Sequence, residues 1–281
     1  MEYKKVIRYV KAIIKLEVHN VSVYLLLLSI FLIIQYCFSN VSDYLIENSQ
    51  SMNFFELYVA FMSTRQSQLI YIVAIILLIK GGCFSDSSMT FYLVRMNKKI
   101  WLNTQWIYVF LEITLLNLFI MVCILVASNG LCDLKPEWSD AFLTASQFSP
   151  EKIGIRSIVS FSYNLTKYNP NFIGIITFVL SMMIGMVSGI TIIYFDIMKK
   201  TIVGAITVLL LCFLDVIVEF VPVFSVFEYI SYYGLSRIYR LSVNNYRPTI
   251  VYSICFFSCS IIILYNIGIY IVKKIDVLKM E

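Results

Sequence analysis

Six apolar stretches, each about as long as a membrane-spanning helix, constrain this sequence more than any other feature. A helix needs roughly 20 mostly apolar residues to cross the hydrocarbon core of a bilayer. The composition agrees, because 60% of the 281 residues are hydrophobic, only 14% are charged and the mean hydropathy is +0.83. We therefore predict one all-α integral membrane domain with six transmembrane helices. The predicted spans are residues 21–38, 69–84, 106–127, 172–195, 202–221 and 250–272.

The N-terminal residues 1–19 have the pattern of an amphipathic helix that lies in the inner membrane interface. Lys4, Arg8, Lys11 and Lys15 recur at helical spacing, and apolar residues fall on the other side. The alternative is a plain cytosolic leader. The basic residues are spread through the stretch instead of preceding an apolar core, so we expect no cleavable signal peptide.

The distribution of Lys and Arg predicts that both termini are cytoplasmic, because basic residues are denser in the segments that this topology places inside. Residues 85–104 then form a cytoplasmic segment and residues 128–171 an extracytoplasmic loop. The apolar, aromatic segment after Pro222 is too short to cross and return, which predicts an outer re-entrant segment before the last helix. The net charge of +5 arises at the helix ends, so we expect no nucleic-acid partner.

Lys80 and Glu112 are ionisable residues inside predicted spans, where a charge is costly unless it is paired or solvated. They lie sixteen residues on either side of position 96, the middle of the hairpin between the second and third spans. Equal depth makes an intramembrane ion pair the favoured interpretation, with a role in a transport path as the alternative.

Asp215 and Glu219 are four residues apart and therefore share one face of the fifth span. Two like charges on one face indicate either a water-filled transport path or a cationic partner. Arg237 and Arg240 in the following segment could supply that partner, and the sequence leaves both interpretations open.

Ser181, Gly185 and Gly189 recur every four residues in the fourth span, a small-residue pattern that lets helix backbones approach closely. Helix packing is its expected role. The seven cysteines lie mostly inside apolar runs without CxxC spacing, so we predict no metal site. The single histidine, His19, lies outside the spans, and neither this residue nor any catalytic motif supports an enzyme.

The segment CFSDSSMTFYLVRMNKKIWL, residues 83–102, resembles the loop between the second and third helices of type-2 ABC exporter permeases. That loop often has an acidic residue, a small residue or Thr, an apolar pair and a basic cluster. The amphipathic start, the six spans and the ending IVKKIDVL extend the resemblance over the whole chain. The residues that match the loop are Asp86, Thr90, Phe91, Tyr92, Arg95, Lys98 and Lys99.

The resemblance implies that this loop is a coupling segment that docks on a separate ATPase subunit, which binds ATP and Mg. It implies a second permease copy or a paralogous permease, and export of an amphipathic or hydrophobic substrate such as an antimicrobial or signalling peptide. A solvated loop near anionic lipid is the alternative for the segment. Richness in Ile, Tyr, Asn and Lys is typical of low-GC Gram-positive bacteria, so we expect a bacterial cell membrane. The rival function is a non-transporting immunity or assembly protein that sequesters a peptide through residues 128–171.

Overall fold

The chain is mostly helical. The computed structural model describes residues 6, 7, 10, 11, 14, 19–81, 97–147, 163–220, 222–241 and 248–274. Its longer helices are α2 (Val21–Glu47), α4 (Arg65–Gly81), α6 (Lys98–Ala127), α8 (Pro170–Ile197), α9 (Thr201–Phe220) and α11 (Ile250–Lys274). The shorter helices are α3 (Phe54–Met62), α7 (Asp140–Gln147), α10 (Tyr232–Ser236), η3 (Tyr163–Lys167), η4 (Pro222–Tyr229) and η5 (Ile238–Arg240). Two short strands, β1 (Met52–Asn53) and β2 (Cys132–Asp133), pair in parallel.

The set of apolar helices is that of a multi-pass membrane protein. Within the described residues, four helices are long and apolar enough to cross a bilayer: α2, α6, α8 and α11. Helices α3 and α4 pass this test only as a pair, and their axes meet at 80°. The apolar part of α9, Ile202–Val218, is shorter. Length and composition therefore support four spans, or five if the bent pair counts as one.

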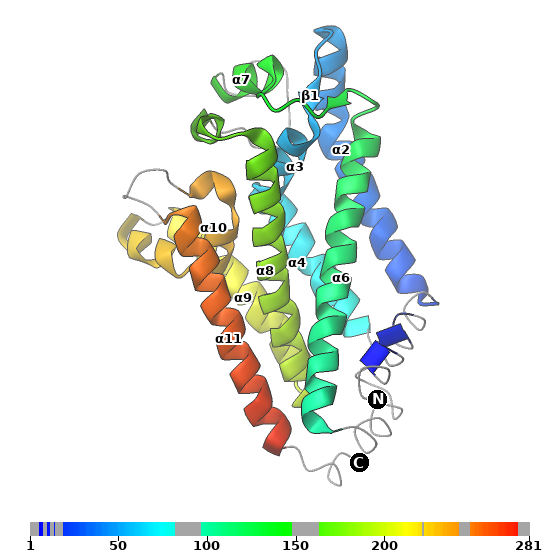
Figure 1. Cartoon of the computed structure of the whole chain (residues 1–281), viewed down its shortest axis with the longest axis vertical. Coiled ribbons are helices and arrows are strands. Elements are labelled where there is room, and N and C mark those ends of the chain that lie inside the picture. Colours follow the sequence, from blue (N-terminus) through cyan, green and yellow to red (C-terminus); the bar gives the residue numbers. More distant parts are fainter. Residues whose placement is uncertain are drawn as a thin grey trace.

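Helix α8 lies at the centre of the bundle and packs against α3, α4, α6, α9 and α11 (Figure 1). In its most apolar stretch 72% of the residues are buried, against 22% in α2 and 17% in α11. The outer helices thus present apolar faces, as a surface in contact with lipid requires.

The two ends of the bundle differ in what covers them. Helix α7 and the β1–β2 pair lie together at one end (Figure 1), which we call the α7 end. At the opposite end the ammonium of Lys98, at the start of α6, lies 3.5 Å from the carbonyl oxygen of Lys273, near the end of α11. Helices α6 and α11 are therefore antiparallel neighbours at this end.

The segment between the first two predicted spans is largely helical. Helix α2 continues beyond residue 38 to Glu47, because Val41, Ser42 and Leu45 are buried and Ser42 donates to the carbonyl oxygen of Ala127 at 2.9 Å. After the turn, α3 forms a second buried element. The predicted span ends at residue 38 because polar residues follow it. In the structure these residues continue the helix, and one face of it is buried.

Helix α6 also starts earlier than its predicted span. Asn97 caps it through a hydrogen bond from the backbone N–H of Lys99, so residues 98–104 of the predicted cytoplasmic segment are the first turns of α6. Near the N-terminus the described residues are helical, with Val6 and Val10 buried and Lys11 exposed. Ile7, which the pattern puts on the apolar side, is exposed, so the amphipathic interfacial helix stays a prediction.

Candidate functional site

The break between α3 and α4 is the structural origin of the candidate site. Helix α3 ends at Met62 with Ser63 as its C-cap, and α4 begins at Arg65. The hydroxyl of Thr64 caps the new helix by accepting from the backbone N–H of Ser67 at 3.2 Å. The last carbonyls of a helix have no partner within it, and in an apolar environment they must find one elsewhere in the protein.

Arg237 supplies one of these partners. Its Nε–H donates to the carbonyl oxygen of Ser63 at 3.2 Å, and its Nη1 donates to the carboxylate of Asp215 on α9 at 2.6 Å. Asp215 also accepts from Arg240 and, at 3.1 Å, from the hydroxyl of Ser231. Asp215 is 1% exposed and Arg237 2% exposed, so the ion pair is shielded from solvent.

Asp215 therefore has cationic partners, which is one of its two interpretations, and its place in a transport path stays a prediction. Its carboxylate is bound by the arginines of the segment that follows α9. Gly234 lets the backbone of this segment approach the carboxylate closely. A Cβ atom at this position would lie 2.7 Å from the carboxylate oxygen Oδ1 of Asp215 and 3.0 Å from the hydroxyl of Ser231.

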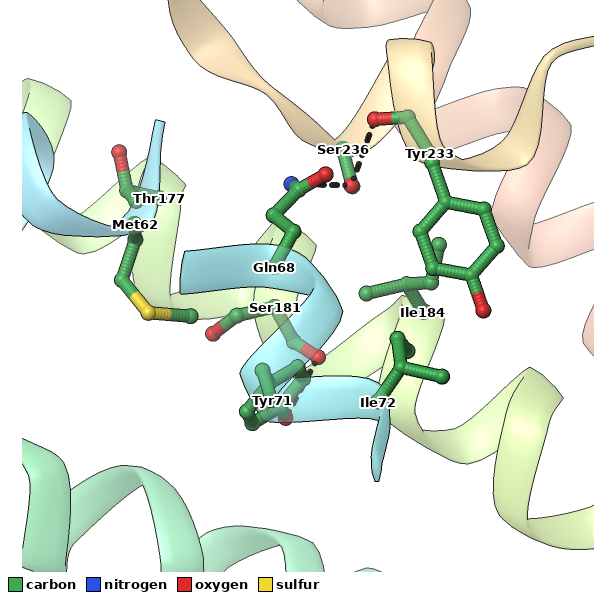
Figure 2. Close-up of a pocket in the computed structure, with 9 residues that line it drawn as sticks. All are labelled: Met62, Gln68, Tyr71, Ile72, Thr177, Ser181, Ile184, Tyr233 and Ser236. Atoms are coloured by element: carbon green, nitrogen blue, oxygen red, sulfur yellow. Dashed lines mark hydrogen bonds between the residues drawn. The ribbon is translucent and has the colours of Figure 1, made fainter. Parts of the chain in front are cut away.

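A second polar contact joins the same segment to α4. The amide Nε2 of Gln68 donates to the hydroxyl of Ser236 at 2.7 Å, and both side chains line a small cavity with Tyr71, Ser181 and Tyr233 (Figure 2). The open volume of this cavity is about 10 Å³, which is close to the minimum that holds one water molecule. It is therefore too small for an organic substrate.

Asn117 on α6 forms a hydrogen-bonded hub beside this cavity. Its side-chain oxygen accepts from Tyr58 at 3.3 Å and from Ser181 at 2.8 Å, and its amide nitrogen donates to the hydroxyl of Tyr71 at 2.7 Å. Tyr71 in turn donates to the carbonyl oxygen of Ser181 at 3.0 Å. The hub thus ties α3, α4, α6 and α8 together.

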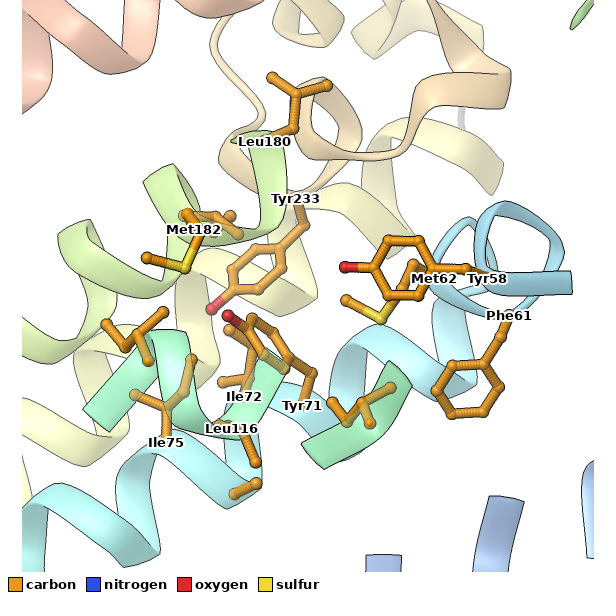
Figure 3. Packing of buried hydrophobic residues seen from close by; sticks show 14 of the residues in the cluster. Tyr58, Phe61, Met62, Tyr71, Ile72, Ile75, Leu116, Leu180, Met182 and Tyr233 are labelled. Carbon is orange, nitrogen blue, oxygen red and sulfur yellow. The ribbon is translucent and has the colours of Figure 1, made fainter. Parts of the chain in front are cut away.

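Apolar side chains surround this hub on all of these helices. Figure 3 shows Tyr58, Tyr71 and Tyr233 among Leu116, Leu180 and other buried apolar residues. The low dielectric of such surroundings strengthens the hydrogen bonds and makes an unpaired polar group costly. Together the Asp215 ion pair, the Gln68 contact and the Asn117 hub form what we call the polar centre.

The small residues of α8 lie where neighbouring helices approach closely. A Cβ atom on Gly185 would lie 2.7 Å from Ile113 on α6 and 2.8 Å from the hydroxyl of Tyr71 on α4. A Cβ atom on Gly189 would lie 2.5 Å from Ile79 on α4. Ser181 belongs to the hub.

At the α7 end, Glu56 joins α3 to the segment between α6 and α8. Its carboxylate accepts from the backbone N–H of Asn53 at 3.0 Å, and from the backbone N–H and hydroxyl of Ser139 at 2.7 and 2.6 Å. The indole of Trp138 donates to the carbonyl oxygen of Tyr168 at 2.6 Å. The described parts of this segment, which include β2, α7 and η3, are therefore folded onto the bundle.

A salt bridge stabilises the same end. Lys135 lies 2.9 Å from the carboxylate of Asp133. Burial by itself would raise the pKa of Asp133, but hydrogen bonds from Lys135 and Ser51 outweigh this effect and lower the pKa below its ordinary value.

The other predicted site residues are distributed as follows. Asp86, Thr90, Phe91, Tyr92 and Arg95 lie outside the described residues, whereas Lys98 and Lys99 lie in the first turn of α6. Glu112 is buried on α6. Lys80 lies on α4 and Glu219 on α9, but their side chains are outside the described part, so the Lys80–Glu112 pair stays a prediction.

Sequence reasoning missed Asn117 and the Asn53–Glu56 pair. The signal for Asn117 was a lone amide inside an apolar span, where polar side chains commonly hydrogen-bond between helices. The signal for the pair was the N-x-x-E spacing before an apolar run, a capping box that the structure forms.

Within the described residues, no group of three or more His, Cys, Asp and Glu side chains is placed to hold a metal ion. The polar centre therefore offers positioned hydrogen bonds and one buried ion pair.

Comparison of the chain with protein-family models, with curated proteins and with solved structures found no match.

Proposed function

We propose that the chain is the membrane-spanning permease subunit of an ATP-driven exporter, of the type-2 ABC class that its sequence resembles. It works with a separate ATPase subunit, which binds ATP and Mg, and with a second copy or a paralogous permease. Its substrate is amphipathic or hydrophobic and moves outward. In this proposal α3–α4 is a broken second span, α9 is the fifth span and η4 to η5 form the outer re-entrant segment, which makes six spans.

The observation that carries the proposal is the break between α3 and α4, held by Arg237. Irregular backbone at membrane depth is tolerated only where protein or a water-filled cavity surrounds it, and discontinuous helices in transporters are found at the substrate path. The break lets α3 move relative to α4. Arg237 and Asp215 connect this joint to the segment after α9, so movement of one requires movement of the other.

The proposed orientation places the α7 end outside and both termini in the cytoplasm. The coupling segment, residues 85–104, then leads directly into α6, which contributes Asn117 to the hub. A rigid helix that joins a cytoplasmic surface to the centre of the bundle is a direct route for ATP-driven movement.

The experiment is affinity purification of the chain from native membranes in mild detergent. We expect a Walker-motif ATPase to co-purify, and to be lost when Arg95, Lys98 and Lys99 are all changed to Glu. The variant Lys167→Glu, which reverses an exposed charge at the α7 end, is the control that keeps the ATPase. If the native chain brings down no ATPase, the exporter proposal loses its energy source.

The folded segment at the α7 end favours a second candidate, a membrane immunity or assembly protein that sequesters a peptide. Glu56 and Trp138 hold this segment in place, as a preformed binding surface requires. This function needs no ATPase. It predicts that the purified chain alone protects cells or binds peptide, and that the triple Glu variant keeps this activity.

A further inference from the structure

The end of the bundle opposite α7 carries a patch of lysines that the polar centre does not use. The last turn of α11 contributes Lys273 and Lys274, and the first turn of α6 contributes Lys99; all three are exposed. The contact between Lys98 and the carbonyl oxygen of Lys273 at 3.5 Å brings these two turns together. We call Lys99, Lys273 and Lys274 the lysine patch.

Within the described residues of these two turns, every charged side chain is a lysine. The first turn of α6 contains no acidic residue, and α11 contains none along its whole length. Lys98 is directed to the C-terminal end of α11, where a positive charge interacts favourably with the helix dipole. Lys274 lies 4.4 Å above the ring of Tyr270, which holds its ammonium against the helix surface.

A layer of aromatic residues lies at a matched depth beneath the patch. Trp106 is about 10 Å along α6 from Lys99, and Tyr265 is about 12 Å along α11 from Lys273, at 1.5 Å per residue. Their rings meet edge to face at 5.5 Å. The indole of Trp106 also donates to the hydroxyl of Tyr194 at 3.2 Å. Lysines above a Trp and Tyr layer are typical of the headgroup region of a membrane.

Exposed apolar side chains flank this layer on the same two helices. They are Ile263 and Ile267 on α11, and Ile107 and Phe110 on α6. A phospholipid bound here has apolar surface for its chains and cations for its phosphate.

From this arrangement we propose that the lysine patch is a binding site for the headgroup of an anionic phospholipid at the ends of α6 and α11. Charge complementarity selects this partner, since a clustered set of lysines next to membrane-embedded helices attracts anionic lipid. The inference does not rest on the proposed exporter function.

The test uses the full chain reconstituted in phosphatidylcholine vesicles that contain brominated phosphatidylglycerol, with tryptophan quenching as the measurement. The contribution of Trp106 is the part of the quenching that disappears in Trp106→Phe. We expect brominated phosphatidylglycerol to quench more strongly than brominated phosphatidylcholine at equal mole fraction. Lys273→Gln with Lys274→Gln should weaken the apparent affinity for phosphatidylglycerol about 30-fold, at roughly fivefold for each lysine.

Two variants keep the result specific. Lys273→Arg with Lys274→Arg should retain the preference for phosphatidylglycerol, and Lys135→Gln with Lys167→Gln, which removes the same charge at the α7 end, should leave it unchanged. Equal quenching by both lipids in the native chain, or an unaltered preference in the Lys273/Lys274 Gln variant, would overturn the proposal. A third result would also overturn it: the native chain shows no lipid preference, and a protein that co-purifies with it is lost in the Lys273/Lys274 Gln variant. The patch would then be assigned to a protein partner.

Discussion

Arg237 donates to the backbone carbonyl oxygen of Ser63 at 3.2 Å, across 174 residues of the chain. The same guanidinium binds Asp215 at 2.6 Å. One side chain therefore satisfies a carbonyl at the end of α3 and neutralises a carboxylate on α9. A flexible lysine could reach either partner, but only the planar fork of arginine holds both in fixed directions.

Replacement of Asp215 by Asn should be strongly destabilising, because it leaves the buried guanidinium of Arg237 without its counter-ion. Breaking a buried ion pair on one side costs about 3–5 kcal/mol. The free energy of unfolding, measured by denaturation in mixed detergent micelles, should fall by this amount. Glu137→Gln, an exposed acid in the segment between α6 and α8, is the control and should change it by less than about 0.5 kcal/mol. Equal effects of the two variants would contradict the assigned role of Asp215.

Arg237→Lys tests the second bond of the guanidinium separately. The variant keeps the positive charge beside Asp215 but cannot also donate to the carbonyl oxygen of Ser63 from Nε. Leaving a buried acceptor unsatisfied costs about 1–3 kcal/mol, which is the expected loss in the same unfolding measurement. A variant as stable as the native chain would show that this carbonyl does not depend on Arg237.

Gly189→Ala should destabilise the bundle, because its methyl group would meet Ile79 on α4 at 2.5 Å and Val109 on α6 at 2.7 Å. Overpacking of this kind costs about 1–3 kcal/mol. Ile79→Val removes the nearer atom, so the double variant should lose less stability than the sum of the two single variants. If the stability loss of the double variant equals the sum of the losses of the two single variants, the two residues are not in contact.

Asn117→Leu removes the centre of the hydrogen-bonded hub while it keeps an apolar side chain of similar size. Hydrogen bonds between membrane helices contribute about 0.6 kcal/mol on average and up to about 1.7. Loss of three such bonds should lower the free energy of unfolding by about 2 kcal/mol. Tyr58→Phe removes the bond to Asn117 and the 3.3 Å contact with the hydroxyl of Ser181, and it should cause a smaller loss than Asn117→Leu.

The positions of the long helices could be predicted from hydropathy, because apolar runs such as residues 172–195 lie within single helices. Their ends could not. Residues 39–47 are too polar for a membrane span, yet one face of this stretch packs on the end of α6 through Ser42 and Leu45. Hydropathy averages over all faces of a helix and cannot detect that one of them is buried.

The candidate site was predictable only in part for a related reason. A pairing of Asp215 with Arg237 or Arg240 was one of two interpretations that the sequence left open, because a charge within a membrane needs a partner. The role of Ser63 did not, because a backbone carbonyl becomes available only where a helix breaks. The sequence contains no Pro or Gly at this break, so the 80° turn between α3 and α4 depends on tertiary contacts.

Glu56→Gln should loosen the folded segment at the α7 end. Its carboxylate accepts two hydrogen bonds from Ser139, and bonds to a charged group contribute about 1.5–3 kcal/mol. An amide group can accept at only one of these positions, so the variant loses one of the two bonds. The population of molecules in which this segment has detached from the bundle, the open state, should therefore rise at least tenfold. Trypsin cleavage after the exposed Lys167 measures this opening and should accelerate by the same factor. Glu137→Gln, an exposed acid two residues before Ser139, is the matched control and should be cleaved at the native rate.

In the proposed orientation trypsin added to intact spheroplasts reaches Lys167, and cleavage that occurs only after the membrane is broken would reverse the topology.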